Sequence, residues 1–445
     1  MKKLKKMLAA LLCVCMVFSL AACGGTTAGE GSGDAEAEET SETATSGDTV
    51  KVGVLLPLSG STAYYGEVQL NGIEFCVDYV NENGGIEALG GKQIELVVQD
   101  SASDPETGVS AFEYLVDAGV SAVVGPYNST VAAATAPLAI QYGIPYIIVN
   151  ATGENFMSEE NKYVYRTNTG STDGDNMWKL IIDYLNSVRA DNPTDKIAVV
   201  YDEGDWGSAA VESWRSNAEE WGYEVVVDES VSETTTDMST LVNKIKTAEA
   251  DIVICACFSA ATNLLCKTMS DYQCDAKIAG LGGGIGDIGF IENCGDSAEN
   301  VLYSAPWIPS YGGACEEAEE LAAQFAEKYG YEMTMEPCWG WLGMATIVNA
   351  LEAAASEDTE AVADALYNLS VGADDWSLWF SGYEGVEFAT EGQTRDSFTS
   401  DNHERYNNNK LLGETDGMVL VQVQNGEWVI VYPESYTDGN DLINY

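Results

Sequence analysis

Short apolar runs alternate with helical patterns along the first part of the folded body of this chain. The apolar runs cover residues 50–56, 94–99, 120–125 and 145–150, and they are nearly continuous, which is typical of strands buried on both faces. Residues 66–80 carry apolar side chains at helical spacing. Asp104-Pro105 and Asn128-Ser129-Thr130 favour the starts of two further helices. This order predicts βαβ units and a parallel sheet.

The alternation then starts again, which predicts a second α/β lobe. Strands are expected at 197–201, 224–227, 251–257 and 277–280, and helices at 206–221, 238–248 and 260–272. After a strand at 301–305, helices are expected at 316–329, 339–355 and 359–369. The last predicted strands, 418–423 and 427–432, are joined by Asn425-Gly426, which is a strong hairpin signal.

The first residues predict an export signal. Lysines among the first six residues precede an apolar run at 7–20, which is shorter than the roughly 20 residues that a membrane-spanning helix needs. We therefore expect a signal peptide over residues 1–22. The run ends in Leu20-Ala21-Ala22-Cys23, which resembles the bacterial lipoprotein signal and implies that Cys23 carries lipid. The alternative is cleavage elsewhere and release of a secreted protein.

The segment that follows Cys23 predicts a tether. Residues 24–48 consist of Gly, Ser, Thr, Ala and acids, without a basic residue, so they cannot bury a core. We interpret residues 23–48 as a lipidated, acidic and flexible linker that holds the folded body away from the membrane.

Charge and cysteine content narrow the functional class. The formal net charge of −51 argues against binding to nucleic acid or to anionic lipid, although a pocket can differ in sign from the surface around it. The eight cysteines beyond Cys23 are interpreted mainly as buried thiols, and their pairing stays open. No metal-ligand spacing is evident, and His403, the only histidine, lies in a polar run that does not favour catalysis.

Two strand ends and one helix start predict a binding cleft. The opening strand of each lobe leads into an aromatic-glycine step, Tyr65-Gly66 or Trp206-Gly207, and ligands of open parallel sheets bind beyond the carboxyl ends of the strands. Ser129 and Thr130 begin a helix, whose free N–H groups and partial positive charge favour a ligand carboxylate. The alternative is that Asn128 or Ser129 only caps that helix.

The order and spacing of several motifs resemble the branched-chain amino-acid-binding proteins of ABC transporters. These motifs are residues 52–60 (VGVLLPLSG), Tyr65-Gly66, residues 81–86 (NENGGI), Asp104-Pro105, Val124-Gly125-Pro126, Gly143-Ile144-Pro145 and Asn150-Ala151-Thr152. The resemblance covers residues 50–432 and implies the α/β fold of a type I periplasmic binding protein. That fold has two Rossmann-like lobes with parallel central sheets, joined by a three-stranded hinge.

The resemblance also implies lobe boundaries and hinge crossings. The N-terminal lobe is expected to contain residues 49–168 and 306–378, and the C-terminal lobe residues 169–305 and 379–445. The crossings are expected near residues 166–172, 304–308 and 377–387.

The resemblance implies a ligand-binding set in the cleft between the lobes. The positions of Ser129, Asn150 and Thr152 hold the α-carboxylate and amine of the ligand in this family, and the positions of Tyr65 and Trp206 form its walls. Phe258 follows a strand end where another aromatic side chain is common, with a core role as the alternative. The complete expected set is Tyr65, Tyr127, Ser129, Thr130, Asn150, Ala151, Thr152, Trp206 and Phe258.

One position departs from the family pattern. The acid that usually pairs with the ligand ammonium is replaced by Gly282, within Gly282-Gly283-Gly284. A buried ammonium without a charge partner is costly, so either the ligand lacks one or Asp205 or Asp287 supplies the partner. An amino acid, another carboxylic acid, an amide and an aromatic compound all stay open as ligands.

The expected function is capture of a small polar ligand and its delivery to an ABC transporter permease, by a monomer on the extracytoplasmic face of the cell membrane. The membrane contact is the lipid anchor alone, with no cofactor, no nucleic-acid partner and no enzymatic activity. The alternatives are a ligand-sensing receptor component of the same fold and a surface enzyme.

Overall fold

The computed structural model describes residues 49–153, 156, 161–168, 178–188, 196–305, 315–372, 374–381, 385–388 and 418–432. All of them belong to one compact unit of the chain, Ser46–Tyr445. The expected signal peptide, Cys23 and the acidic linker lie outside the described residues.

The first sheet is parallel, as the βαβ pattern predicts. In spatial order, its described strands are β2 (Gln93–Asp100), β1 (Thr49–Leu56), β3 (Ala122–Val124), β4 (Tyr146–Ile148) and β5 (Val164–Arg166). Every neighbouring pair runs parallel. The sequence pattern finds the first four strands and does not predict β5, which consists of three buried residues.

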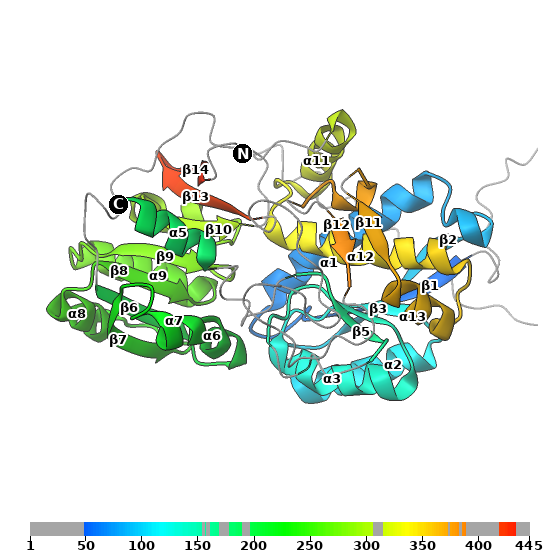
Figure 1. Ribbon diagram of the computed structural model, residues 1–445, viewed down its shortest axis with the longest axis horizontal. Helices are drawn as coiled ribbons and strands as arrows, with labels where there is room; N and C mark the ends of the chain where they lie inside the picture. Colours follow the sequence, from blue (N-terminus) through cyan, green and yellow to red (C-terminus); the bar gives the residue numbers. More distant parts are fainter. Residues whose placement is uncertain are drawn as a thin grey trace, which may run out of the picture. The chain divides into compact units, whose positions relative to one another are not determined.

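Helices cover both faces of this sheet, because alternate side chains of each strand point to opposite faces. Val54 and Val124 pack against α1 (Ala63–Glu82), α11 (Glu316–Tyr329), α12 (Met335–Ala354) and α13 (Thr359–Tyr367). Leu55 and Val123 pack against α2 (Pro105–Asp117) and α3 (Ser129–Tyr142). In Figure 1, α2 and α3 accordingly lie on one side of the strands, with α1 and α12 on the other. Asp104 caps α2 as expected, since its carboxylate accepts the Thr107 N–H at 2.8 Å.

The second sheet is mixed. In spatial order, its described strands are β14 (Glu427–Tyr432), β13 (Val419–Gln424), β10 (Leu302–Ala305), β9 (Lys277–Leu281), β8 (Ile252–Ala256), β6 (Lys196–Asp202) and β7 (Glu224–Val231). The five strands from β10 to β7 are parallel, whereas the β13–β14 hairpin adds to them antiparallel. The hairpin confirms the Asn425-Gly426 signal, and both residues have positive φ.

Helices cover both faces of the second sheet as well. One face is packed by α8 (Ser239–Ala248), α9 (Ser259–Asp271) and α10 (Phe290–Cys294). The other is packed by α5 (Lys179–Val188), α6 (Asp205–Ala210) and α7 (Glu212–Asn217). The single helix predicted at 206–221 is therefore two short helices, and α5 is not predicted by the sequence pattern. Short 3-10 helices cover Glu87–Leu89, Gly295–Ala298 and Trp376–Leu378.

The described residues on either side of the expected crossings can each be assigned to one of the two sheets. β5 belongs to the first sheet and β6 to the second, whereas β10 belongs to the second sheet and α11 packs on the first. The third crossing was expected at 377–387. In this region, β12 (Gly385–Glu387) pairs with β11 (Ser370–Gly372), and Phe388 is buried against Tyr165 of the first lobe. The exact crossings and the lobe boundaries stay predictions, because residues 169–177, 306–314 and 389–417 lie outside the described residues.

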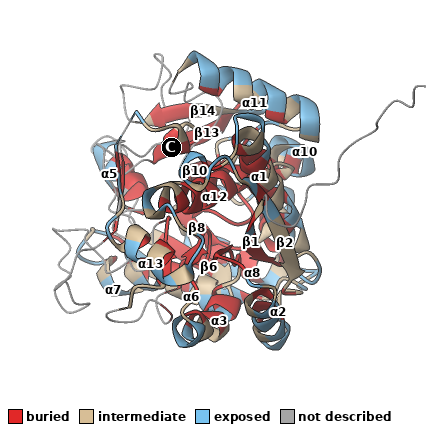
Figure 2. Ribbon diagram, turned by 90° about the vertical axis from the view of Figure 1, so that its right-hand side faces the viewer, coloured by how far each residue is buried: buried red, intermediate tan, exposed pale blue. Residues whose placement is uncertain are grey.

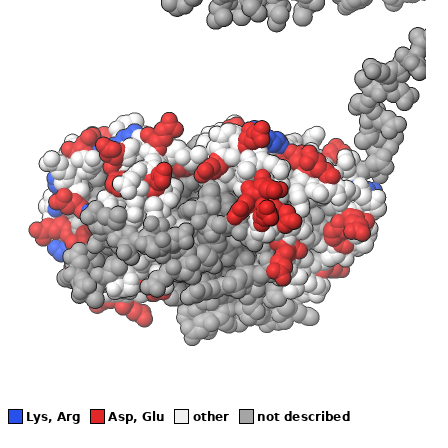
Figure 3. Space-filling view, turned by 90° about the horizontal axis from the view of Figure 1, so that it is seen from above, with Lys and Arg blue, Asp and Glu red and all other residues white. Residues whose placement is uncertain are grey.

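Buried residues gather in the strands and the inner helix faces, and the outer surface of α11 is exposed (Figure 2). Asp and Glu side chains are spread over the described part of the face shown in Figure 3, in agreement with the strongly negative net charge. Among the described helices, none combines the length and the apolar character that crossing a membrane requires. The described residues also contain no group of three or more His, Cys, Asp and Glu side chains arranged to hold a metal ion.

Candidate functional site

The N-terminus of α3 lies at the end of β3 with its first turn free of a side-chain cap. Asn128 occupies the cap position, but its side chain makes no capping bond. Its amide is instead bonded to Thr62 Oγ1, with a distance of 3.0 Å from Asn128 Nδ2. Ser129 is buried, and its Oγ accepts the Gly153 N–H at 3.1 Å. Capping by Asn128 or Ser129 is therefore not observed, and the helix start keeps its positive end for another partner.

The loop after β4 runs past this helix start and is held by a buried carboxyl group. Asn150 Nδ2 donates to Glu336 Oε2 at 2.9 Å, and the same oxygen accepts from Gln69 Nε2 at 3.0 Å. Burial raises the pKa of Glu336 to about 8, a rise that the two amide donors oppose. Glu336 is the second residue of α12, so this carboxyl group joins the loop of Asn150 to two helices of the first lobe, α1 and α12.

Aromatic side chains from both lobes meet beside the loop. The rings of Trp206, on α6, and Phe258, which precedes α9, have centroids 4.8 Å apart. Phe258 also faces Tyr127 of the first lobe at 6.4 Å, and Tyr127 stacks on Tyr65 at 4.9 Å. The Tyr65 hydroxyl accepts the N–H of Ser259, the first residue of α9, at 3.0 Å. This bond directly links α1 of the first lobe to α9 of the second.

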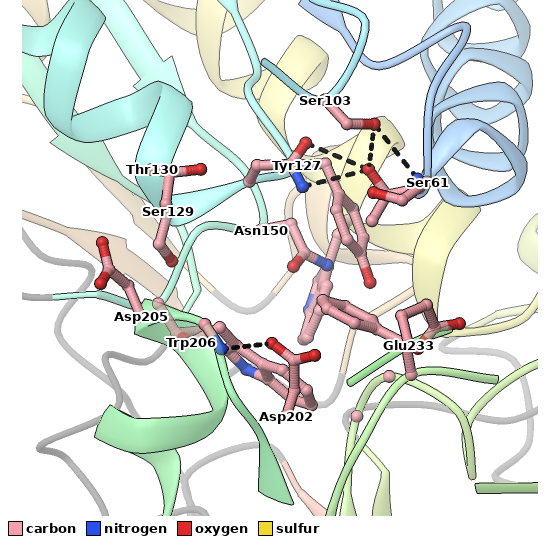
Figure 4. A pocket seen from close by; sticks show the side chains of 18 residues that line it. Ser61, Ser103, Tyr127, Ser129, Thr130, Asn150, Asp202, Asp205, Trp206 and Glu233 are labelled. Carbon is pink, nitrogen blue, oxygen red and sulfur yellow. Dashed lines mark hydrogen bonds between the residues drawn. The ribbon is translucent and has the colours of Figure 1, made fainter. Parts of the chain in front are cut away.

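These elements enclose a cavity of about 200 Å³ (Figure 4). Its walls come from residues that follow β1, β2, β3 and β4 in the first lobe and β6, β7, β8 and β9 in the second, together with α12. The lining residues are Ser61, Thr62, Ser103, Tyr127, Asn128, Ser129, Thr130, Asn150, Thr152, Asp202, Gly204, Asp205, Trp206, Glu233, Phe258, Gly282, Gly283 and Trp339. The volume lies below the roughly 300–1,000 Å³ of pockets for drug-sized ligands, so the cavity suits a smaller molecule.

Most of the predicted binding residues lie at this cavity. Those that line it are Tyr127, Ser129, Thr130, Asn150, Thr152, Trp206 and Phe258. Tyr65 is not among the lining residues, because its ring lies against Tyr127 and its hydroxyl is bonded to Ser259. Ala151 is also absent from the lining, and its side chain is buried in the core beneath α3.

The cavity is acidic. Among the described residues, its lining contains three carboxyl groups, those of Asp202, Asp205 and Glu233, and no Lys, Arg or His. Burial raises the pKa of both Asp202 and Glu233, and the charge of Asp202 adds to the rise at Glu233. Asp287, the other acid considered from the sequence, does not line the cavity, because Ser259 Oγ and the Gly289 N–H occupy its carboxylate oxygens.

Sequence reasoning missed three lining residues of chemical interest. Asp202 and Glu233 belong to a chain with 71 acids, so nothing in their neighbourhood distinguishes them. The carboxyl end of a predicted strand was the only available signal for Asp202. Trp339 was interpreted as a core residue, as was Trp341. Trp341 is fully buried, whereas Trp339 both packs in the second core and lines the cavity.

The chain is similar to known proteins in both sequence and fold. The model of a family described as periplasmic binding protein matches residues 49–394 of the chain. Leu/Ile/Val-binding protein homolog 3 of Brucella melitensis is 27% identical over 321 residues, which cover 72% of this chain and 83% of the relative.

Two solved structures illustrate the likeness in fold. LivJ of Streptococcus pneumoniae, a branched-chain amino acid transporter substrate-binding protein in complex with isoleucine, is 22% identical with a TM-score of 0.69, covering 86% of this chain and 100% of its own. A solute-binding protein of an ABC transporter from Rhodopseudomonas palustris BisB5, in complex with 3,4-dihydroxybenzoic acid, is 20% identical with a TM-score of 0.65, covering 86% and 95%. At these identities the likeness concerns the fold alone.

Proposed function

Since the chain belongs to the periplasmic binding protein family, we propose that it captures a small polar ligand between its lobes and delivers it to an ABC permease. The ligand class is an amino acid or a related carboxylate or amide. Export and a lipid anchor at Cys23, expected from the sequence, place the protein on the extracytoplasmic face of the cell membrane. The cavity supports this function, because the strand ends of both sheets supply its walls.

Closure of the lobes on the ligand is the proposed mechanism. A ligand that touches both lobes stabilises the arrangement in which they meet, by as much as its contacts differ between the open and closed states. The uncapped start of α3 suits a ligand carboxylate, and the Trp206 and Phe258 rings from the other lobe suit its apolar part. The permease would then recognise the closed protein.

A ligand panel tests the function directly. We expect at least one amino acid, carboxylate or amide to raise the melting temperature of the purified protein. Ligand at 100 times its dissociation constant adds about 2.7 kcal/mol to the free energy of unfolding. If no compound of these classes shifts the transition or gives heat in calorimetry, the proposed function is wrong.

Ser129→Ala tests the carboxylate position. We expect the dissociation constant of a carboxylate ligand to rise about tenfold or more, because hydrogen bonds to charged groups contribute about 1.5–3 kcal/mol. The same substitution should have little effect on an analogue without the carboxylate. Ser110→Ala is the matched control, since Ser110 is an exposed serine on α2. If the Ser129 variant and the wild type bind the carboxylate with equal affinity, Ser129 is not part of the binding site.

Tyr65→Phe tests closure separately from ligand contact. The Tyr65 hydroxyl does not line the cavity but accepts the Ser259 N–H across the lobes, so its loss should destabilise the closed state. A net hydrogen bond of about 0.5–1.5 kcal/mol predicts a two- to tenfold rise in the dissociation constant, measured by calorimetry. Tyr114→Phe is the control, because Tyr114 is exposed on α2. If the Tyr65 variant binds ligand as tightly as the Tyr114 control, the hydrogen bond between Tyr65 and Ser259 does not stabilise the closed state.

A further inference from the structure

The carboxyl groups that line the cavity require a cation or a hydrogen-bond donor from the ligand. Asp202, Asp205 and Glu233 line it, and none of the described lining residues is basic. In Figure 4, Asp202 and Glu233 lie in the part of the pocket away from Thr130, whereas Asp205 lies toward Ser129. A carboxylate that loses water without gaining a cation or a donor is destabilised, so a molecule filling this part of the cavity must supply one.

The hydrogen bonds of Glu233 indicate which kind of ligand group would pair with it. Its Oε1 accepts the Ala260 N–H at 3.3 Å, whereas its Oε2 is buried and has no hydrogen-bond partner. Buried polar atoms are rarely left unpaired in native proteins, so an unpaired carboxylate oxygen on a residue that lines a cavity needs an explanation. Because a carboxylate oxygen can only accept, the missing partner is a hydrogen-bond donor.

Asp202 lies at the end of β6 and shares this part of the cavity. Its Oδ1 accepts the Gly204 N–H at 2.8 Å. Burial raises the pKa of Glu233, the Ala260 N–H opposes this rise, and the charge of Asp202 adds to it, so the two carboxyl groups repel each other when both are ionised. One cation placed near both would remove this repulsion as well as pair the unpaired oxygen.

Gly282 leaves the cavity without an acid at the position where the family pattern has one. The residue has a φ of +25°, and a Cβ placed there would meet no atom within 4 Å, so the position leaves open space where an acid is expected. Trp339 also lines the cavity; only 5% of it is exposed, and its indole Nε1 has no hydrogen-bond partner. That N–H suits an acceptor group elsewhere on the same ligand.

We infer that Asp202 and Glu233 form a subsite for a protonated amine of the ligand, in place of the acid missing at Gly282. This inference rests on the proposed function. The amine must carry N–H groups, because a quaternary ammonium can face an aromatic ring but cannot donate to Glu233 Oε2. The ligand class is therefore an amino acid or another amine, rather than an amine-free carboxylic acid.

A matched panel tests the amine. The probes are L-leucine, L-lysine and putrescine, compared with 4-methyl-2-oxopentanoate, glycine betaine and 3,4-dihydroxybenzoate, each by thermal shift and calorimetry on the full mature protein. We expect binding only among the three primary amines. If an amine-free probe or betaine binds and the amines do not, the subsite is wrong but the binding function stands. If no probe binds, the amine inference fails for these ligands, and the wider panel above decides the function.

Variants locate the amine once a primary amine binds. Glu233→Gln and Asp202→Asn keep shape and acceptor oxygens but remove the charge, and each should raise the dissociation constant about tenfold or more. Glu203→Gln is the control, because it removes an exposed charge next to Asp202 that does not line the cavity. The melting temperature of each ligand-free variant checks folding. Correctly folded variants that bind the amine as tightly as wild type would overturn the subsite.

Discussion

Replacing Gly72 by alanine is expected to lower the free energy of unfolding by about 3 kcal/mol, because α1 and α12 touch backbone to backbone at this residue. A Cβ at Gly72 would lie 2.0 Å from the carbonyl oxygen of Pro337 and 2.7 Å from its Cα. The reverse contact is as tight, since a Cβ at Gly340 would lie 2.3 Å from the carbonyl oxygen of Gln69. Backbone cannot move aside as a flexible side chain can, so the two helices must separate.

Urea unfolding measures this effect, with a fall in the midpoint and an unchanged slope as the expected result. Glu67→Ala is the control on the same helix: Glu67 is exposed, and its replacement should change stability by about 0.5 kcal/mol or less. Separation of the helices also displaces Gln69 from Glu336, so the Gly72 variant should bind ligand more weakly. A midpoint equal to that of the control would show that the helix contact is looser than described.

Replacing Glu336 by glutamine is expected to stabilise the protein at neutral and alkaline pH and to leave it unchanged near pH 4. Burial raises the pKa of Glu336 from 4.5 to about 8. Between these values the folded state holds one proton more than the unfolded state, so this group makes the free energy of unfolding fall as pH rises. The slope is about 1.4 kcal/mol for each pH unit.

Glutamine removes this slope because it stays neutral, while its amide oxygen still accepts from Gln69 and Asn150. The measurement is the difference in free energy of unfolding between variant and wild type from pH 4 to 9, in which the other titrating groups largely cancel. We expect the difference to grow from about pH 4.5 and to level off above pH 8. Glu336→Ala is the control, because it leaves both amides unpaired and should destabilise at every pH. A pH-independent difference for the glutamine variant would mean that Glu336 is not held protonated.

Local signals in the sequence predicted much of the fold. The apolar runs at 50–56 and 94–99 are strands because both of their faces are covered by helices, and that burial leaves a continuous apolar pattern. Asp104 caps α2, and Asn425-Gly426 joins β13 to β14. These features depend on residues close together in the chain. By contrast, β5 and the β11–β12 pair are too short to carry a pattern of their own.

The site was only partly predictable. Trp206 and Ser129 could be found because each stands at a strand-helix turn, where an open parallel sheet binds its ligands. Glu233 could not, because both its place in the cavity lining and its unpaired oxygen arise only in the folded protein. Glu336 could not either, since its environment is made by Gln69 and Asn150, more than 180 residues away along the chain.

The sequence by itself determined the order of strands and helices, the repeated α/β lobes and the family, because backbone preference and hydrophobic periodicity are local properties. Only the tertiary structure decided which acids face the cavity, that Tyr65 links the lobes instead of lining the site, and that β12 pairs with β11. Those outcomes depend on which distant segments meet and on how much water each polar atom loses there. A local sequence pattern contains no information on which distant segments meet or on how much water a polar atom loses.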